Sequence, residues 1–170
     1  MNNVFIYQGI RCLLIVLLQV LILNQIELSR YLSPYIYPLF ILTLPLETPI
    51  WAVLLIGFGT GFAIDIFGNT PGLHTAATVL LAYVRGIIIS RQKQSIDYAG
   101  GQQLELSDFG LGWFFAYALA CIGIHHFSYF LLEIFSLSYM PYVLAKTIAS
   151  GALSLALIML SRYLSIRKIA

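Results

Sequence analysis

The chain has 170 residues, of which 60% are hydrophobic and 9% are charged, and its mean hydropathy is +0.90. A soluble domain carries roughly 25% charged residues, so this chain has too few charges to cover a water-facing surface. The composition therefore excludes a soluble globular domain and indicates one integral membrane domain over residues 1–170, with the lipid bilayer as its solvent. The formal net charge is only +2, which gives no reason to expect nucleic acid as a partner.

Six apolar segments are predicted to cross the bilayer as helices, which makes the chain an all-α polytopic membrane protein. In chain order they are residues 4–23, 34–46, 49–67, 72–90, 109–135 and 141–163. Crossing the hydrocarbon core takes roughly 20 helical residues, and the second segment is shorter than that and contains three prolines. We expect a short span at 34–46, with a re-entrant segment as the alternative.

Basic residues are distributed unevenly between the two sides of the predicted bundle. Six spans put both termini and the polar loop at 91–108 on one side. The basic residues of that side are Arg11, Arg85, Arg91, Lys93, Arg162, Arg167 and Lys168, whereas the other side holds Arg30 and Lys146. Because cytoplasmic loops are enriched in Lys and Arg, both termini are predicted to be cytoplasmic. If segment 34–46 did not cross, the N-terminus would lie outside.

Residues 57–85 read as a hairpin of two apolar helices joined by a tight turn at 68–72. The first helix carries four small residues, which are Gly57, Gly59, Gly61 and Ala63. Small side chains let a second helix approach the backbone closely, so we expect this helix to be a packing surface. The sequence leaves open whether the covering helix belongs to this chain, to a second copy of it or to another partner.

A polar cluster formed by Asp65, Asn69 and His74 is predicted at the tip of this hairpin. A carboxylate within an apolar segment is costly unless it is buried in protein or placed at a water-filled cavity. One interpretation is a proton or metal site, and the other is a structural clamp that holds the turn. Asp65 lies near the predicted end of its span, where ionisation costs less, and this position favours the clamp.

The fifth span carries Cys121 and His125 four residues apart, on one face of a helix. That spacing can serve a metal ion, but no further ligand pattern accompanies it, so we predict neither a metal nor a cofactor. No serine or cysteine has the neighbours of a nucleophile, and the chain is therefore not expected to be an enzyme.

Glu133 and Lys146 flank a predicted turn at 136–140 and should lie at similar depth. Because intramembrane charges usually pair, we predict an ion pair between them. The chain is also rich in Tyr and Trp near the predicted span ends, such as Tyr35, Tyr37, Trp51 and Tyr139. We interpret these rings as an interfacial aromatic belt.

The order of these features resembles one family. The segment P-L-F-I-L-T-L-P at 38–45, the Gly61-x-x-x-Asp65 helix, T-P-G-L-H at 70–74, L-L-A-Y at 80–83 and a basic C-terminal tail are similar to the rod-shape-determining protein MreD family. Nearly the whole chain takes part in the resemblance, although its specific part is residues 57–85.

The resemblance implies a non-enzymatic scaffold of the cell-elongation machinery in the bacterial cytoplasmic (inner) membrane. Its expected partner is an MreC-like bitopic protein, and through it an MreB-like actin homologue and the RodA–transpeptidase peptidoglycan synthase. The family is also thought to share its fold with the substrate-binding subunits of energy-coupling-factor vitamin transporters. A vitamin-type binding subunit is therefore the alternative, although the predicted outer loops offer few polar groups for a pocket.

Overall fold

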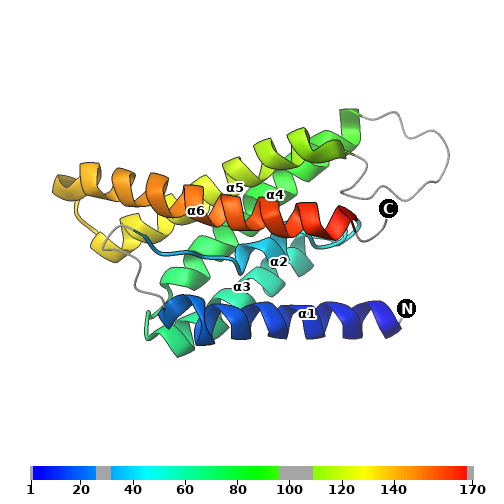
Figure 1. The fold of residues 1–170 in the computed structure, drawn as a ribbon, viewed down its shortest axis with the longest axis horizontal. Helices are drawn as coiled ribbons and strands as arrows, with labels where there is room; N and C mark the ends of the chain where they lie inside the picture. The colour runs from blue at the N-terminus through cyan, green and yellow to red at the C-terminus, as the bar shows by residue number, and fades with distance from the viewer. Residues whose placement is uncertain (1, 26–31, 96–108, 168–170) are drawn as a thin grey trace.

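The computed structural model describes residues 2–25, 32–95 and 109–167, which form a bundle of helices (Figure 1). Its long helices are α1 (Asn2–Leu21), α3 (Ile50–Gly68), α4 (Leu73–Ser95), α5 (Gly110–Ile134) and α6 (Met140–Arg167). A short helix, α2 (Pro38–Leu42), lies between α1 and α3, and single 3-10 turns occur at Leu23–Gln25 and Leu137–Tyr139.

Within the described residues, five helical segments are long and apolar enough to cross a membrane. They are Ile6–Gln25, Ile50–Gly68, Leu73–Gln92, Gly110–Ile134 and Leu137–Leu164. Each overlaps one of the six predicted spans, and the boundaries differ by a few residues. The chain is therefore an all-helical, multi-pass membrane protein.

The predicted span at 34–46 is not a continuous helix, and the structure corrects this part of the prediction. Only the five residues of α2 are helical there, between stretches of irregular backbone. The physical cause is its prolines, because Pro34, Pro38 and Pro45 each lack the N–H that a continuous helix needs. The segment is nevertheless buried: Ile41 and Leu42 are completely inaccessible and belong to the main hydrophobic core.

The helices pack mainly against their neighbours in the chain. α3 packs against α4, α4 against α5 and α5 against α6, while α1 packs against α3. In Figure 1, α1 and α5 begin at the same end of the bundle at which α4 and α6 finish. The loop predicted at 91–108 falls mostly on residues 96–108, outside the described part of the chain, and its cytoplasmic location stays a prediction.

The glycines of α3 divide between two faces of the helix. A Cβ atom built on Gly61 would lie 2.6 Å from Thr75 Cα, and one built on Gly57 would lie 3.1 Å from Ala82 Cβ. These two glycines therefore let α3 and α4 touch within the hairpin, so the helix that covers them belongs to this chain.

Gly59 was grouped with the packing surface, but it is exposed and a Cβ there would meet nothing within 4 Å. The reason is helical geometry, since residues two apart are rotated by about 200° around the helix axis and therefore lie on nearly opposite faces. Ala63 lies at the border, half-buried against the second hydrophobic cluster.

Candidate functional site

The candidate site begins with the irregular segment between α1 and α3, at residues 33–46. Outside the short helix α2, the backbone of this segment needs hydrogen-bond partners that a regular helix would otherwise provide. An unsatisfied backbone group costs several kcal/mol in a bilayer, and irregular backbone is tolerated there only where protein or water surrounds it. Four helices, α1, α4, α5 and α6, supply polar side chains for this purpose. Gln19 of α1 accepts from the backbone N–H of Ile36 at 2.8 Å and donates to the carbonyl of Pro34 at 3.0 Å.

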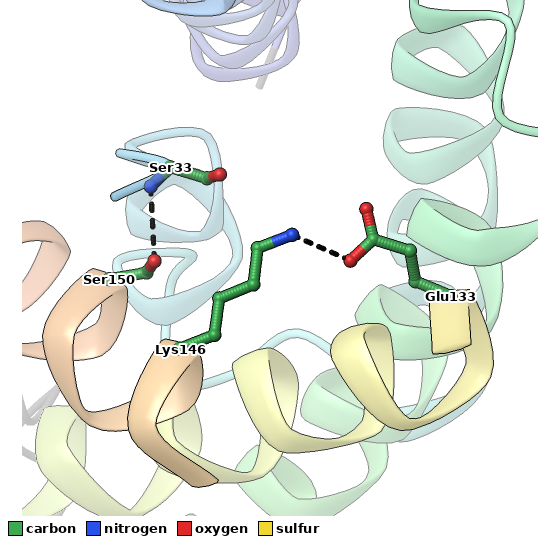
Figure 2. A network of polar contacts seen from close by, with 4 residues as sticks. All are labelled: Ser33, Glu133, Lys146 and Ser150. Atoms are coloured by element: carbon green, nitrogen blue, oxygen red, sulfur yellow. Dashed lines mark hydrogen bonds and ion pairs between the residues drawn. The ribbon is translucent and has the colours of Figure 1, made fainter. Parts of the chain in front are cut away.

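On α6, two serine hydroxyls accept from the same segment. Ser150 Oγ accepts from Ser33 N at 3.0 Å, and Ser154 Oγ accepts from Tyr35 N at 2.9 Å. Figure 2 shows the first of these contacts. Ser150 and Ser154 are fully buried, so each hydroxyl replaces a water molecule that the bilayer interior cannot provide.

Further along the segment, the carbonyls are satisfied. Tyr117 of α5 donates to the Leu42 carbonyl at 3.0 Å, and Arg85 of α4 donates to the Leu44 carbonyl at 2.7 Å. Arg11 of α1 donates to the hydroxyl of Thr43. Side chains far apart in the sequence thus determine how this segment lies.

These contacts also give the direction of the segment. Its start contacts Gln19, late in α1, and Thr43 contacts Arg11, earlier in α1, so the two run antiparallel. Along α4 the contacts proceed from His74 to Arg85, which is about 16 Å of helix. The segment therefore passes lengthwise through the bundle beside its helices.

Asp65 holds the turn between α3 and α4. Its Oδ1 accepts from Thr70 Oγ1 at 2.8 Å and His74 N at 3.0 Å, and its Oδ2 accepts from Thr75 N at 2.8 Å and Thr75 Oγ1 at 2.5 Å. Two of these donors are backbone N–H groups at the start of α4, which have no partner within the helix. A carboxylate at this position also interacts favourably with the positive end of the helix dipole.

Asn69 and His74, the other predicted members of the tip cluster, are placed differently. Asn69 ends α3 in the left-handed region at φ 51°, and its N–H donates to the Asp65 carbonyl. This conformation suits Asn better than most residues. His74 reaches Asp65 only through its backbone, and its imidazole lies in the interior of the bundle. The structure brings the three residues together at the turn, without contact between the Asp65 and His74 side chains.

Tyr37 links two histidines in the interior. Its hydroxyl lies 2.9 Å from His74 Nδ1, 2.6 Å from His125 Nε2 and 3.2 Å from Thr78 Oγ1. All four of these side chains are at most 3% exposed. Cys121, which lies four residues before His125, is not part of this cluster, and His125 Nε2 contacts Tyr37.

The prediction that Tyr35 and Tyr37 lie in an interfacial belt is wrong. Tyr37 is completely buried and Tyr35 is 8% exposed, whereas Trp51 and Tyr139 are more than half exposed. The Tyr35 ring packs 5.0 Å from His74 and 5.3 Å from Tyr129, between ring centroids. The only sequence signal for this was their position beside Pro34 and Pro38, where a regular interfacial helix is disfavoured.

A cavity of about 490 Å³ opens beside this cluster. Its polar lining comes from Asn24, Gln25, Ser33, Tyr35, Thr70, His74 and Tyr129, and its apolar lining includes Val20, Leu32 and Phe67. Among these described residues none carries a formal charge at neutral pH when His74 is neutral. The lining suits an uncharged molecule that forms hydrogen bonds.

Glu133 and Lys146 are brought together across the turn between α5 and α6 (Figure 2). Lys146 Nζ lies 2.8 Å from Glu133 Oε2 and also sits 4.6 Å from the centroid of the Phe130 ring. The Lys146 side chain is 12% exposed and that of Glu133 is 35% exposed. The pair neutralises a lysine that the bundle would otherwise hold unpaired.

Metal-ligating and nucleophilic side chains can also be located in the described part of the chain. No three His, Cys, Asp or Glu side chains there converge on a point that could hold a metal ion. The buried serines Ser150 and Ser154 accept from backbone N–H groups, and Ser154 Oγ also lies 3.1 Å from His126 Nε2.

No family model matches the sequence, and no curated protein or solved structure matches it either.

Proposed function

We propose that this chain is a non-enzymatic membrane scaffold of the MreD type, which binds partner membrane proteins of the bacterial cell-elongation machinery. The proposal rests on the role of the polar residues in the hairpin of α3 and α4, the part of the chain that most resembles the MreD family. Asp65, the charged residue of that motif, accepts four hydrogen bonds, and these hold the turn and the start of α4 against α3. A residue committed in this way stabilises a shape and is not available for a substrate.

The scaffold would have six crossings, with the segment between α1 and α3 as the second. Its lengthwise path beside α4, over about 16 Å, supports this count. A sixth crossing would place both termini on one side, in agreement with the basic residues there. It would also match the arrangement expected of the energy-coupling-factor binding subunits.

Depleting the chain in its own bacterium tests the function. The proposal predicts that rod-shaped cells become rounder and that new peptidoglycan is no longer inserted along the cylinder. Re-expression of the wild-type chain and of Gly59→Ala, a change at an exposed glycine, should restore both. Unchanged shape and unchanged insertion after confirmed depletion would overturn the proposal.

A second candidate function, a vitamin-type small-molecule binding subunit, is favoured by one observation. The cavity of about 490 Å³ is of the size typical for small-ligand sites, and several polar groups converge on it. Extraction of the purified chain followed by mass spectrometry of the released small molecules tests this. A single stoichiometric compound that is lost in Tyr129→Trp would favour the binding subunit, and its absence would favour the scaffold.

A further inference from the structure

Arg85 of α4 is the largest completely buried side chain of the described residues and is 1% exposed. It lies within a membrane-crossing segment, seven residues before Gln92, where that segment ends. This distance is about 10 Å of helix, so Arg85 lies inside the apolar segment and not at its end. A cation at this depth is costly and is normally paired with a negative charge.

The contacts of Arg85 within the described chain are all with neutral groups. Its Nη2 donates to the carbonyls of Leu44 at 2.7 Å and Pro45 at 3.2 Å. Its Nε is buried without a hydrogen-bond partner. No carboxylate among the described residues forms an ion pair with it. Among the described residues the guanidinium therefore has no ion-pair partner, and its Nε donor is not used.

A second cavity, of about 290 Å³, has Arg85 among its lining residues. Arg85, Thr48 and Ser90 provide its polar lining, and the rest is apolar, including Ile50, Val53 and Ile89. Helix α3 begins at Ile50, and Pro49 before it provides no side-chain cap. The positive end of the α3 dipole thus adds to the positive charge beside the cavity.

From these contacts we propose that this cavity binds a phosphate-type anion, with the Arg85 guanidinium as its counter-ion. Arginine offers a planar set of donors that suits phosphate oxygens. The source of the phosphate is either the headgroup of an anionic phospholipid or inorganic phosphate from solution. The apolar wall of Ile50, Val53 and Ile89 gives a lipid the additional advantage of an acyl-chain contact.

The test is native mass spectrometry of the purified full chain with added phosphatidylglycerol or phosphatidylcholine. We expect the chain to retain phosphatidylglycerol in preference to phosphatidylcholine, and Arg85→Gln to weaken that retention roughly tenfold or more, as expected for the loss of a charge-assisted contact. Arg91→Gln, an exposed arginine on the same helix, is the control and should retain lipid like the wild type.

A second variant keeps the proposal testable if Arg85→Gln does not fold. Ser90→Trp leaves Arg85 in place but fills the mouth of the cavity, because Ser90 is an exposed member of its lining. It should weaken retention similarly. A separate arm adds inorganic phosphate: competition with phosphatidylglycerol identifies a site open to free phosphate, and no competition identifies a headgroup site. Equal retention of both lipids by the wild type, or wild-type retention in Ser90→Trp, would overturn the proposal.

Discussion

Asp65 accepts hydrogen bonds at both carboxylate oxygens, and this determines what an isosteric amide would do there. In Asp65→Asn one oxygen becomes an NH₂ group that faces N–H and O–H donors, so at least one donor at the start of α4 loses its partner. We expect a loss of about 1–3 kcal/mol in the free energy of unfolding. Thermal unfolding in detergent measures it.

Thr70→Val provides a graded comparison, because it removes only one of the four hydrogen bonds to Asp65. Its loss should be smaller than that of Asp65→Asn. If Asp65→Asn unfolds at the wild-type temperature, the carboxylate does not hold the turn as described.

Tyr37 has a single hydroxyl at the centre of the buried histidine cluster. Tyr37→Phe keeps the ring in the core but leaves His74 Nδ1, His125 Nε2 and Thr78 Oγ1 without it. We expect the free energy of unfolding to fall by about 1–3 kcal/mol, the usual cost of an unpaired buried polar group. Tyr83→Phe, at a half-exposed ring of α4, is the matched control and should have little effect on unfolding.

At the scale of elements, the hairpin of α3 and α4 depends on close backbone contact. Gly61→Ala would place a Cβ atom 2.6 Å from Thr75 Cα, and because that atom is backbone, the helices must separate. We expect this change to destabilise the chain by about 1–3 kcal/mol, as overpacking does. Folded yield and thermal unfolding in detergent are the measurements.

Gly59→Ala is the matched control for this contact, two residues away on the exposed face of the same helix. Alanine is the better helix former by roughly 1 kcal/mol, so this variant should be as stable as the wild type or more stable. If Gly59→Ala destabilised the chain as much as Gly61→Ala, the two faces of α3 would not differ in how closely they are packed.

The elements that the sequence predicted well are those whose hydrophobicity is continuous. Five spans are long apolar stretches bounded by turns such as Gly68–Gly72, and local composition is enough to find them. The segment at 34–46 was predicted as a short span because its composition is equally apolar. Its prolines are visible in the local sequence, but its conformation also depends on distant side chains such as Gln19, Ser154 and Arg85, which a local pattern does not contain.

For the candidate site, too, the sequence predicts the features that local residues determine and misses those that depend on distant residues. The sequence favours a clamp at Asp65 because this residue lies near the predicted end of its span, where ionisation costs less. The pairing of Tyr37 with His125 links residues 88 positions apart, and nothing in the spacing of either residue indicates the other. The cavity likewise arises from several elements at once, which is why the outer loops alone suggested no pocket.

For the whole molecule, the path of the irregular segment predicts which residues face the outside. Asn24 and Glu47 lie before and after that segment, so a sixth crossing puts them on opposite sides. In a chain whose two native cysteines, Cys12 and Cys121, are replaced by alanine, Asn24→Cys should react with an impermeant thiol reagent in intact cells and Glu47→Cys should not. Both positions reacting alike would indicate that the segment re-enters and does not cross.

The most direct measurement is copurification of the tagged chain from its native membranes after mild crosslinking, with identification of every bound protein. The scaffold account predicts a bitopic membrane protein of the elongation machinery together with its peptidoglycan synthase, present in the wild type and lost in Gly61→Leu, which forces α3 and α4 apart. Recovery of a transporter's ATP-binding subunits in place of those proteins would contradict the scaffold account and support the small-molecule binding subunit.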